Sequence, residues 1–184
     1  MTGSARLAAL CIAVIAPFLA SAIGGDALAR APAPAAQNNL PPLQITHRTG
    51  LRVVVQVNSA ETMPNGVGKQ VMGAKNLYDQ YLAQGMTPGK DFEIVLVFRA
   101  DGAQFLLTDA AYDLKVKAPH PAGNPSRAIL DSLHEGGVSL YECGVAMKMK
   151  GYEASDILPY GRVVASGIAA IVDLEKSGYL SITP

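Results

Sequence analysis

The 184-residue sequence has no tryptophan, few aromatic residues and little charge. Aromatic residues make up 6% of the chain, which disfavours a platform on which bases or sugars stack. The 15 basic side chains balance the 15 acidic ones, so we expect no nucleic-acid binding. A net charge of zero also removes a barrier to self-association, and together with a hydrophobic fraction of 49% it predicts a homo-oligomer.

The apolar run near the start of the chain, residues 7–20, is too short to cross a bilayer and is interrupted by Pro17. It follows Arg6 and precedes two small-residue cleavage sites, Ala-Ser-Ala and Ala-Leu-Ala. This pattern is typical of a signal peptide, here residues 1–29, and favours a bacterial protein that is periplasmic or secreted. We expect no stable membrane insertion after processing. The alternative is that the run stays in place as a membrane anchor.

A linker rich in proline and alanine follows over residues 30–50, and we expect the folded domain over residues 51–184. Two nearly continuous apolar runs, residues 51–57 and 92–98, predict strands that are covered on both faces. Strands that alternate with helical patterns predict parallel β-α-β units. The fold class is therefore α/β, a three-layer α/β/α sandwich on a mostly parallel sheet of about five strands.

The other elements are predicted from helical periodicity and from the glycines that end it. Further strands are expected at residues 138–142, 162–164 and 179–182, and helices at residues 67–84, 103–107, 126–135, 145–150 and 166–177. Ser126 and Ser166 each stand where a hydroxyl would cap the start of a helix.

Cysteine is almost absent, and removal of the signal peptide would leave Cys143 as a lone thiol in an exported protein. Cys143 stands at a predicted strand-to-helix turn, on the edge of the sheet where α/β folds bind their ligands. The first N–H groups of the following helix would favour a thiolate, and Gly144 would leave room for another molecule. The alternative is a buried cysteine that only fills space.

The ends of the other strands supply further candidate ligand-binding residues, namely Asn58, Arg99 and Ser166. Lys148 lies about one turn beyond Cys143. Arg99 or Lys148 would stabilise a thiolate or hold an anion, although each also fits a solvated surface charge. Ser166 fits a helix cap better than a catalytic hydroxyl.

Other chemistries leave weaker signals in the sequence. The three histidines show no ligand spacing, so we expect no metal site. Cys143 with Met147 and Met149 could present soft ligands to Cu(I), but methionines on a short helix usually belong to the core. The glycine-rich loop at residues 65–69 lacks the spacing of a nucleotide-binding loop, and we expect no cofactor. A Ser-His-Asp triad stays open, although the sequence has no nucleophile elbow.

The cysteine segment resembles a known family. Residues 142–151, Glu-Cys-Gly-Val-Ala-Met-Lys-Met-Lys-Gly, are similar to the cysteine segment of DsrE/DsrF-like proteins, which relay sulfur in sulfur oxidisers and in tRNA thiolation. The motifs Leu-Pro, Ser-Gly and Gly-Tyr between residues 156 and 179 resemble the exported branch of this family. The similarity covers residues 51–184. Arg99-Ala100 stands where exported relatives often have His-Gly.

The resemblance implies a three-layer α/β domain that often assembles into trimers or hexamers. It also implies a cysteine that carries sulfur as a persulfide, and Cys143 occupies that position. We therefore expect Cys143 to bind or transfer sulfane sulfur, with a donor or acceptor protein or a small sulfur compound as partner. Whether this makes the protein a sulfurtransferase-like enzyme stays open. The alternatives are a non-catalytic module that binds a small ligand and a structural subunit of an oligomer.

Overall fold

The computed structural model describes residues 44–184. The predicted signal peptide and most of the predicted linker lie outside the described residues. Within residues 44–184, no helix is both long enough and apolar enough to cross a membrane.

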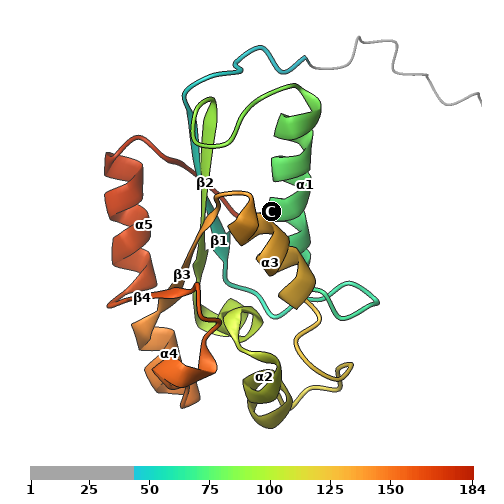
Figure 1. The fold of residues 1–184 in the computed structure, drawn as a ribbon. Helices are drawn as coiled ribbons and strands as arrows, with labels where there is room; N and C mark the ends of the chain where they lie inside the picture. Colours follow the sequence, from blue (N-terminus) through green and yellow to red (C-terminus); the bar gives the residue numbers. More distant parts are fainter. Residues whose placement is uncertain (1–43) are drawn as a thin grey trace, which may run out of the picture. The chain divides into compact units, whose positions relative to one another are not determined.

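A parallel sheet runs through the described part of the chain (Figure 1). In residues 44–184 it has five strands in the order β4-β3-β2-β1-β5, and each pair of neighbours is parallel. The strands are β1 (Leu51–Val57), β2 (Phe92–Phe98), β3 (Ser139–Cys143), β4 (Arg162–Val164) and β5 (Leu180–Ile182). This arrangement confirms the predicted α/β fold.

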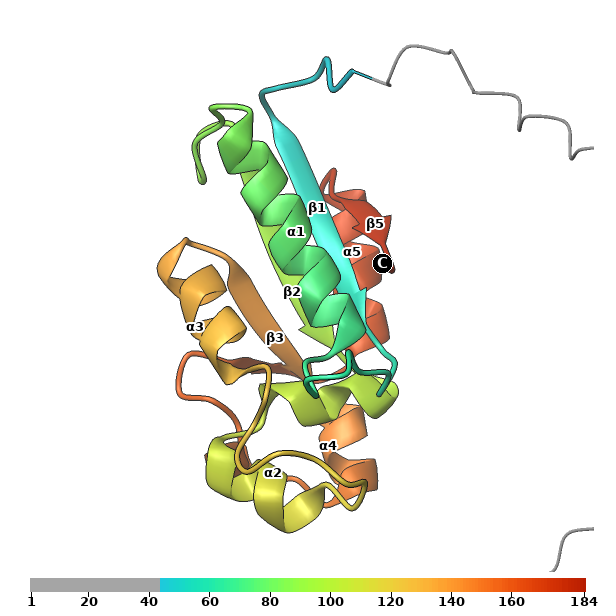
Figure 2. The same ribbon diagram turned by 90° about the vertical axis from the view of Figure 1, so that its right-hand side faces the viewer.

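Helices cover both faces of the sheet (Figures 1 and 2). One face packs against α1 (Lys69–Ala83) and α3 (Arg127–Glu135), and the other packs against α5 (Gly167–Lys176). The shorter elements gather near the carboxyl ends of the strands. They are the 3-10 helices η1 (Ala100–Leu106) and η2 (Ala154–Asp156) and the helices α2 (Asp109–Lys115) and α4 (Gly144–Lys150).

The alternation of side chains along β1 shows why the run of branched residues forms a covered strand. Val53 and Val55 belong to the large core on the side of α1 and α3. Val54, between them, belongs to a smaller core with Val97 and Ile171 of α5. Because both faces of the strand are buried, every position favours an apolar residue, and β-branched side chains suit this geometry.

Two predicted details of the helices differ from the structure. The short helix expected over residues 103–107 is η1, and a separate helix, α2, starts after Thr108, whose hydroxyl accepts the Ala111 N–H at 3.3 Å. The predicted cap at Ser126 is wrong. Ser126 already has helical backbone angles, and its buried hydroxyl accepts the N–H of Gly68 at 3.0 Å instead.

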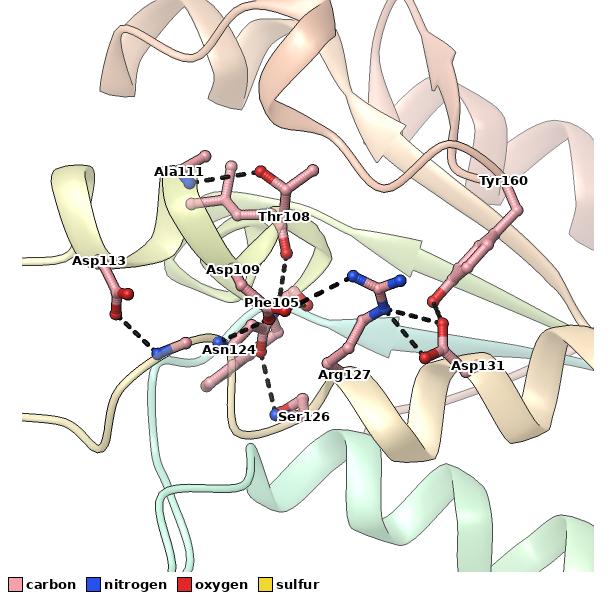
Figure 3. Close-up of polar contacts among 12 residues, drawn as sticks. Phe105, Thr108, Asp109, Ala111, Asp113, Asn124, Ser126, Arg127, Asp131 and Tyr160 are labelled. Atoms are coloured by element: carbon pink, nitrogen blue, oxygen red, sulfur yellow. Dashed lines mark hydrogen bonds and ion pairs between the residues drawn. The ribbon is translucent and has the colours of Figure 1, made fainter.

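A buried amide ties the loop before α3 to the rest of the fold (Figure 3). Asn124 donates from Nδ2 to the carbonyl oxygens of Phe105 and Leu107, at 2.8 and 2.7 Å, and its Oδ1 accepts the Ser126 N–H. These bonds satisfy the amide away from water and anchor the end of η1. Since Ala103 of η1 packs against Cys143, they also support the candidate site.

Candidate functional site

Cys143 is the last residue of β3 and the residue that precedes α4, the strand-to-helix turn that the sequence predicts. Its side chain is 6% exposed and packs against Ala103 of η1 and Ala146 of α4. Both neighbours are small, and the partly buried Tyr152 also packs against this cluster.

The N–H group that meets the sulfur comes from a different helix than expected. Among the described residues, the Cys143 side chain accepts no N–H from the start of α4. Its Sγ instead accepts the backbone N–H of Gly167, the first residue of α5, at 3.1 Å. Side chains alternate along a strand, and Tyr141, two residues earlier, packs on the α5 face. The sulfur therefore points to the same face and meets the start of α5.

Glycine at position 167 is a steric requirement of this contact. A Cβ atom there would lie 3.0 Å from the Cys143 Cβ and 3.3 Å from Sγ. The sequence reasoning did not count Gly167 as a site residue. The Ser-Gly motif before a helix is the feature of the sequence that could have pointed to Gly167. The motif does not indicate which strand the start of that helix contacts.

Gly144 has a different role from the one predicted. A Cβ atom there would lie 3.0 Å from the carbonyl oxygen of Val164 and 3.4 Å from that of Ala165. The space that Gly144 leaves is therefore occupied by the β4–α5 connection, so it does not provide an approach to the sulfur. The small residue lets the start of α4 lie close to β4.

Cys143 forms part of the wall of a pocket of about 220 Å³ at the carboxyl end of the sheet. Apolar side chains of α4 and α5 form most of its wall, with Cys143 beside them. Val145, Met149 and Ile168 are 50%, 84% and 64% exposed, so the pocket is open to solvent. The polar members of the wall are Arg99 and Ser166.

Arg99 and Ser166, two of the candidate ligand-binding residues at strand ends, both line this pocket. Arg99 donates from Nε and Nη2 to Oε1 of Gln56, at 3.2 and 2.7 Å. The Ser166 hydroxyl accepts the Ala169 N–H at 3.3 Å, which confirms its predicted role as the cap of α5. Ser166 therefore both caps α5 and forms part of the pocket wall.

Asn58 and Lys148 lie away from the pocket. Asn58 follows β1, and both its N–H and its Oδ1 bind the side chain of Gln70, at 2.7 and 3.0 Å. Lys148 is exposed on α4 and is not part of the pocket wall. The structure therefore brings Cys143, Arg99 and Ser166 together but leaves these two residues outside.

Ala100 adds backbone strain at the pocket. With a φ of 49°, it is the only non-glycine residue with positive φ in the described part of the chain. The left-handed region costs an L-residue about 1–2 kcal/mol, and such strain often persists at functional sites. Ala100 forms part of the pocket wall, directly after Arg99.

Glu142, which flanks the cysteine and is not among the predicted site residues, is a fully buried carboxyl. Its Oε1 accepts the Cys143 N–H at 3.0 Å, and its Oε2 has no hydrogen-bond partner among the described residues. Burial raises the pKa of Glu142 to about 9, so the side chain is a neutral acid at pH 7. The feature of the sequence that could have pointed to Glu142 is an acidic residue at a strand position next to the cysteine.

The described residues contain no group of three or more His, Cys, Asp or Glu side chains that could hold a metal ion. The two methionines considered with Cys143 separate in the structure. Met147 belongs to the main core, whereas Met149 lines the pocket.

The model of the DsrE/DsrF-like family matches residues 68–184, which include the whole pocket wall. The protein of unknown function MTH1491 from Methanobacterium thermoautotrophicum is 20% identical, with a TM-score of 0.54 over 73% of this chain and 99% of its own. The ychN protein from E. coli is 14% identical, with a TM-score of 0.48 over 72% of this chain and 97% of its own. A search of curated proteins finds no match. The likeness to MTH1491 shows a shared fold.

Proposed function

Because the chain belongs to the DsrE/DsrF-like family, we propose that it binds and transfers sulfane sulfur through Cys143. The family suggests a sulfur-relay fold, and the matched residues include Cys143. The observation that carries the proposal is the place of Cys143, which lines an open pocket and whose Sγ accepts the Gly167 N–H at 3.1 Å. A backbone N–H aimed at sulfur stabilises a negative charge there, as a thiolate or a perthiolate requires.

The proposed transfer is an exchange between sulfur atoms. The Cys143 thiolate attacks the outer sulfur of a donor persulfide, R–S–SH, and a new S–S bond forms as the donor's S–S bond breaks. The products are Cys143–S–SH and R–S⁻, so charge and sulfur atoms balance without an outside oxidant. An acceptor thiolate then attacks the outer sulfur of Cys143–S–SH, and the Cys143 thiolate leaves.

The proposal extends to location and assembly. The predicted signal peptide supports a periplasmic or secreted protein, which would meet its sulfur donor and acceptor there. Exposed apolar side chains outside the pocket support a homo-oligomer, since Val163, Val172 and Leu180 are each about half exposed or more. Analytical ultracentrifugation of the purified protein tests the assembly, and a monomer at tens of micromolar would contradict it.

Thiol labelling tests whether Cys143 has the reactivity that a sulfur carrier needs. At pH 7, the purified protein should react with iodoacetamide faster than free cysteine does, because the Gly167 N–H stabilises negative charge on the attacking sulfur. A Cys143→Ser variant should keep its far-UV circular dichroism and lose the labelling. A rate below that of free cysteine would contradict the proposal.

A module that binds a small ligand without chemistry is the second candidate function. The 6% exposure of Cys143 favours it, because a cysteine that is largely covered can serve as part of a pocket wall. In that case Cys143→Ser would bind the same apolar ligands as the original protein, and neither would take up sulfur.

A further inference from the structure

We propose that the pocket beside Cys143 selects neutral sulfane donors with apolar groups, such as dialkyl polysulfanes, over anionic donors such as thiosulfate. This inference rests on the proposed function, since it names the class of compound that would deliver sulfur to Cys143. It follows from the apolar wall of the pocket, from the hydrogen bonds of its polar groups and from its charge.

The wall of the pocket offers apolar contacts to whatever reaches the sulfur. Val145 and Met149 of α4 and Ile168 of α5 leave half or more of their surface in water. A bound alkyl group would cover this surface, and its burial favours binding. A hydrated anion against these three side chains would lose water, and they offer it no polar partner in return.

The polar groups of the wall already bind other parts of the protein. The Ser166 hydroxyl accepts the Ala169 N–H, and the Gly167 N–H points to the sulfur itself. Arg99 directs Nε and Nη2 to Gln56. The donors left for a sulfonate or carboxylate are the Ser166 O–H and the Nη1 group of Arg99, so an anion gains few partners for the water that it loses.

The charge of the pocket is balanced when Cys143 is a thiolate. Among the described residues that line it, Arg99 is the only charged side chain, and none is acidic. Lys148 lies outside the wall, and Lys150 pairs with Asp101 at 2.8 Å. The positive charge of Arg99 offsets one negative charge, that of the thiolate. An anionic donor adds charge of the same sign as the attacking sulfur, which raises the barrier to approach.

With a dialkyl trisulfide, R–S–S–S–R, the transfer proceeds in two exchanges. The Cys143 thiolate attacks the central sulfur, which forms Cys143–S–S–S–R and releases R–S⁻. The released thiolate then attacks the sulfur that carries R, which forms R–S–S–R and leaves Cys143–S–S⁻. One sulfur atom has moved, the single negative charge is kept, and no other reactant is consumed.

Two trisulfides with the same sulfur chain test this inference, diethyl trisulfide and bis(2-carboxyethyl) trisulfide. The loss of the Cys143 thiol is timed for the purified protein with each, and each rate is divided by the rate of that trisulfide with free cysteine. We expect the normalised rate to be about tenfold higher for the diethyl compound, the factor that about 1.4 kcal/mol of charge repulsion and desolvation produces.

A charge on the wall should shift this preference. Ile168→Lys introduces a cation where the structure has an exposed apolar side chain, and it should speed the dicarboxylate reaction and slow the diethyl one. Leu114→Lys is the matched control, because Leu114 is 70% exposed on α2 and does not line the pocket. It should change neither rate.

The outcomes separate the inference from the function on which it rests. Equal normalised rates, or a higher one for the dicarboxylate, would overturn the selection of neutral donors while Cys143 still takes up sulfur. Failure of Cys143 to react with either compound faster than free cysteine would overturn the carrier function, and the inference with it.

Discussion

The backbone N–H of Gly167 donates a hydrogen bond to Sγ of Cys143 over 3.1 Å. This bond joins the end of β3 to the start of α5, two segments that are 24 residues apart in the chain. It places a fixed donor at the atom that would carry sulfur, in a residue that lines the pocket.

Gly167→Ala should slow sulfur uptake by about tenfold, the effect of weakening one hydrogen bond to a charged atom. The added methyl group would lie 3.0 Å from the Cys143 Cβ, so either the helix start or the cysteine must move. Thr108→Ala is the control, because it removes the cap of α2, which does not line the pocket, and it should cost about 1 kcal/mol of stability with uptake nearly unchanged. Equal losses of uptake in both variants would show that only the stability of the fold matters.

Arg99→Gln should slow the iodoacetamide labelling of Cys143 at pH 7 by about threefold to tenfold, because it removes from the pocket wall a cation that attracts negative charge on the reacting sulfur. Glutamine keeps a polar side chain that can still reach Gln56. Lys148→Gln removes a nearby charge that is exposed and outside the pocket, and it should leave the rate unchanged. If both variants slow labelling equally, the effect comes from net charge and not from the pocket.

Glu142→Gln should remove a pH dependence of stability. The pKa of Glu142 is about 9 in the folded protein, against an ordinary value of 4.5 for the unfolded chain. Below both values the carboxyl is protonated in either state, so its ionisation has no effect on stability. Between them only the unfolded chain loses the proton, and stability falls by about 1.4 kcal/mol per pH unit until the folded pKa is reached.

At pH 7 this loss amounts to about 3 kcal/mol, which the glutamine variant should not show. Urea unfolding at several pH values between 5 and 9 measures it. The free energy of unfolding should fall with pH more steeply in the original protein than in Glu142→Gln. Parallel curves for the two proteins would contradict a neutral, buried Glu142.

The sequence predicts the sheet and the place of Cys143 because both depend on local patterns. A run of β-branched residues such as β1 fits a strand that is covered on both faces, and glycines mark the ends of α1 and α4. The turn at Cys143 needs only a strand followed by a helix. Ser166 as a cap is likewise a local feature, and the structure confirms it.

The details of the site depend on contacts between distant segments, which no local pattern contains. Asn58 and Lys148 lie at the predicted edge, but Gln70 binds the one and solvent surrounds the other. Gly167 meets the sulfur only because β3 and α5 lie side by side in space. The raised pKa of Glu142 depends in turn on its complete burial in the folded chain.

The uptake and release of one sulfur atom at Cys143 is the measurement that tests the carrier function most directly. The purified protein is incubated with a sulfane donor, freed of excess reagent and examined by intact mass spectrometry and peptide mapping. We expect a gain of one sulfur atom on the peptide that contains Cys143, its loss to an added acceptor thiol, and no gain in Cys143→Ser. A protein that gains no sulfur, or a serine variant that gains as much, would contradict the account.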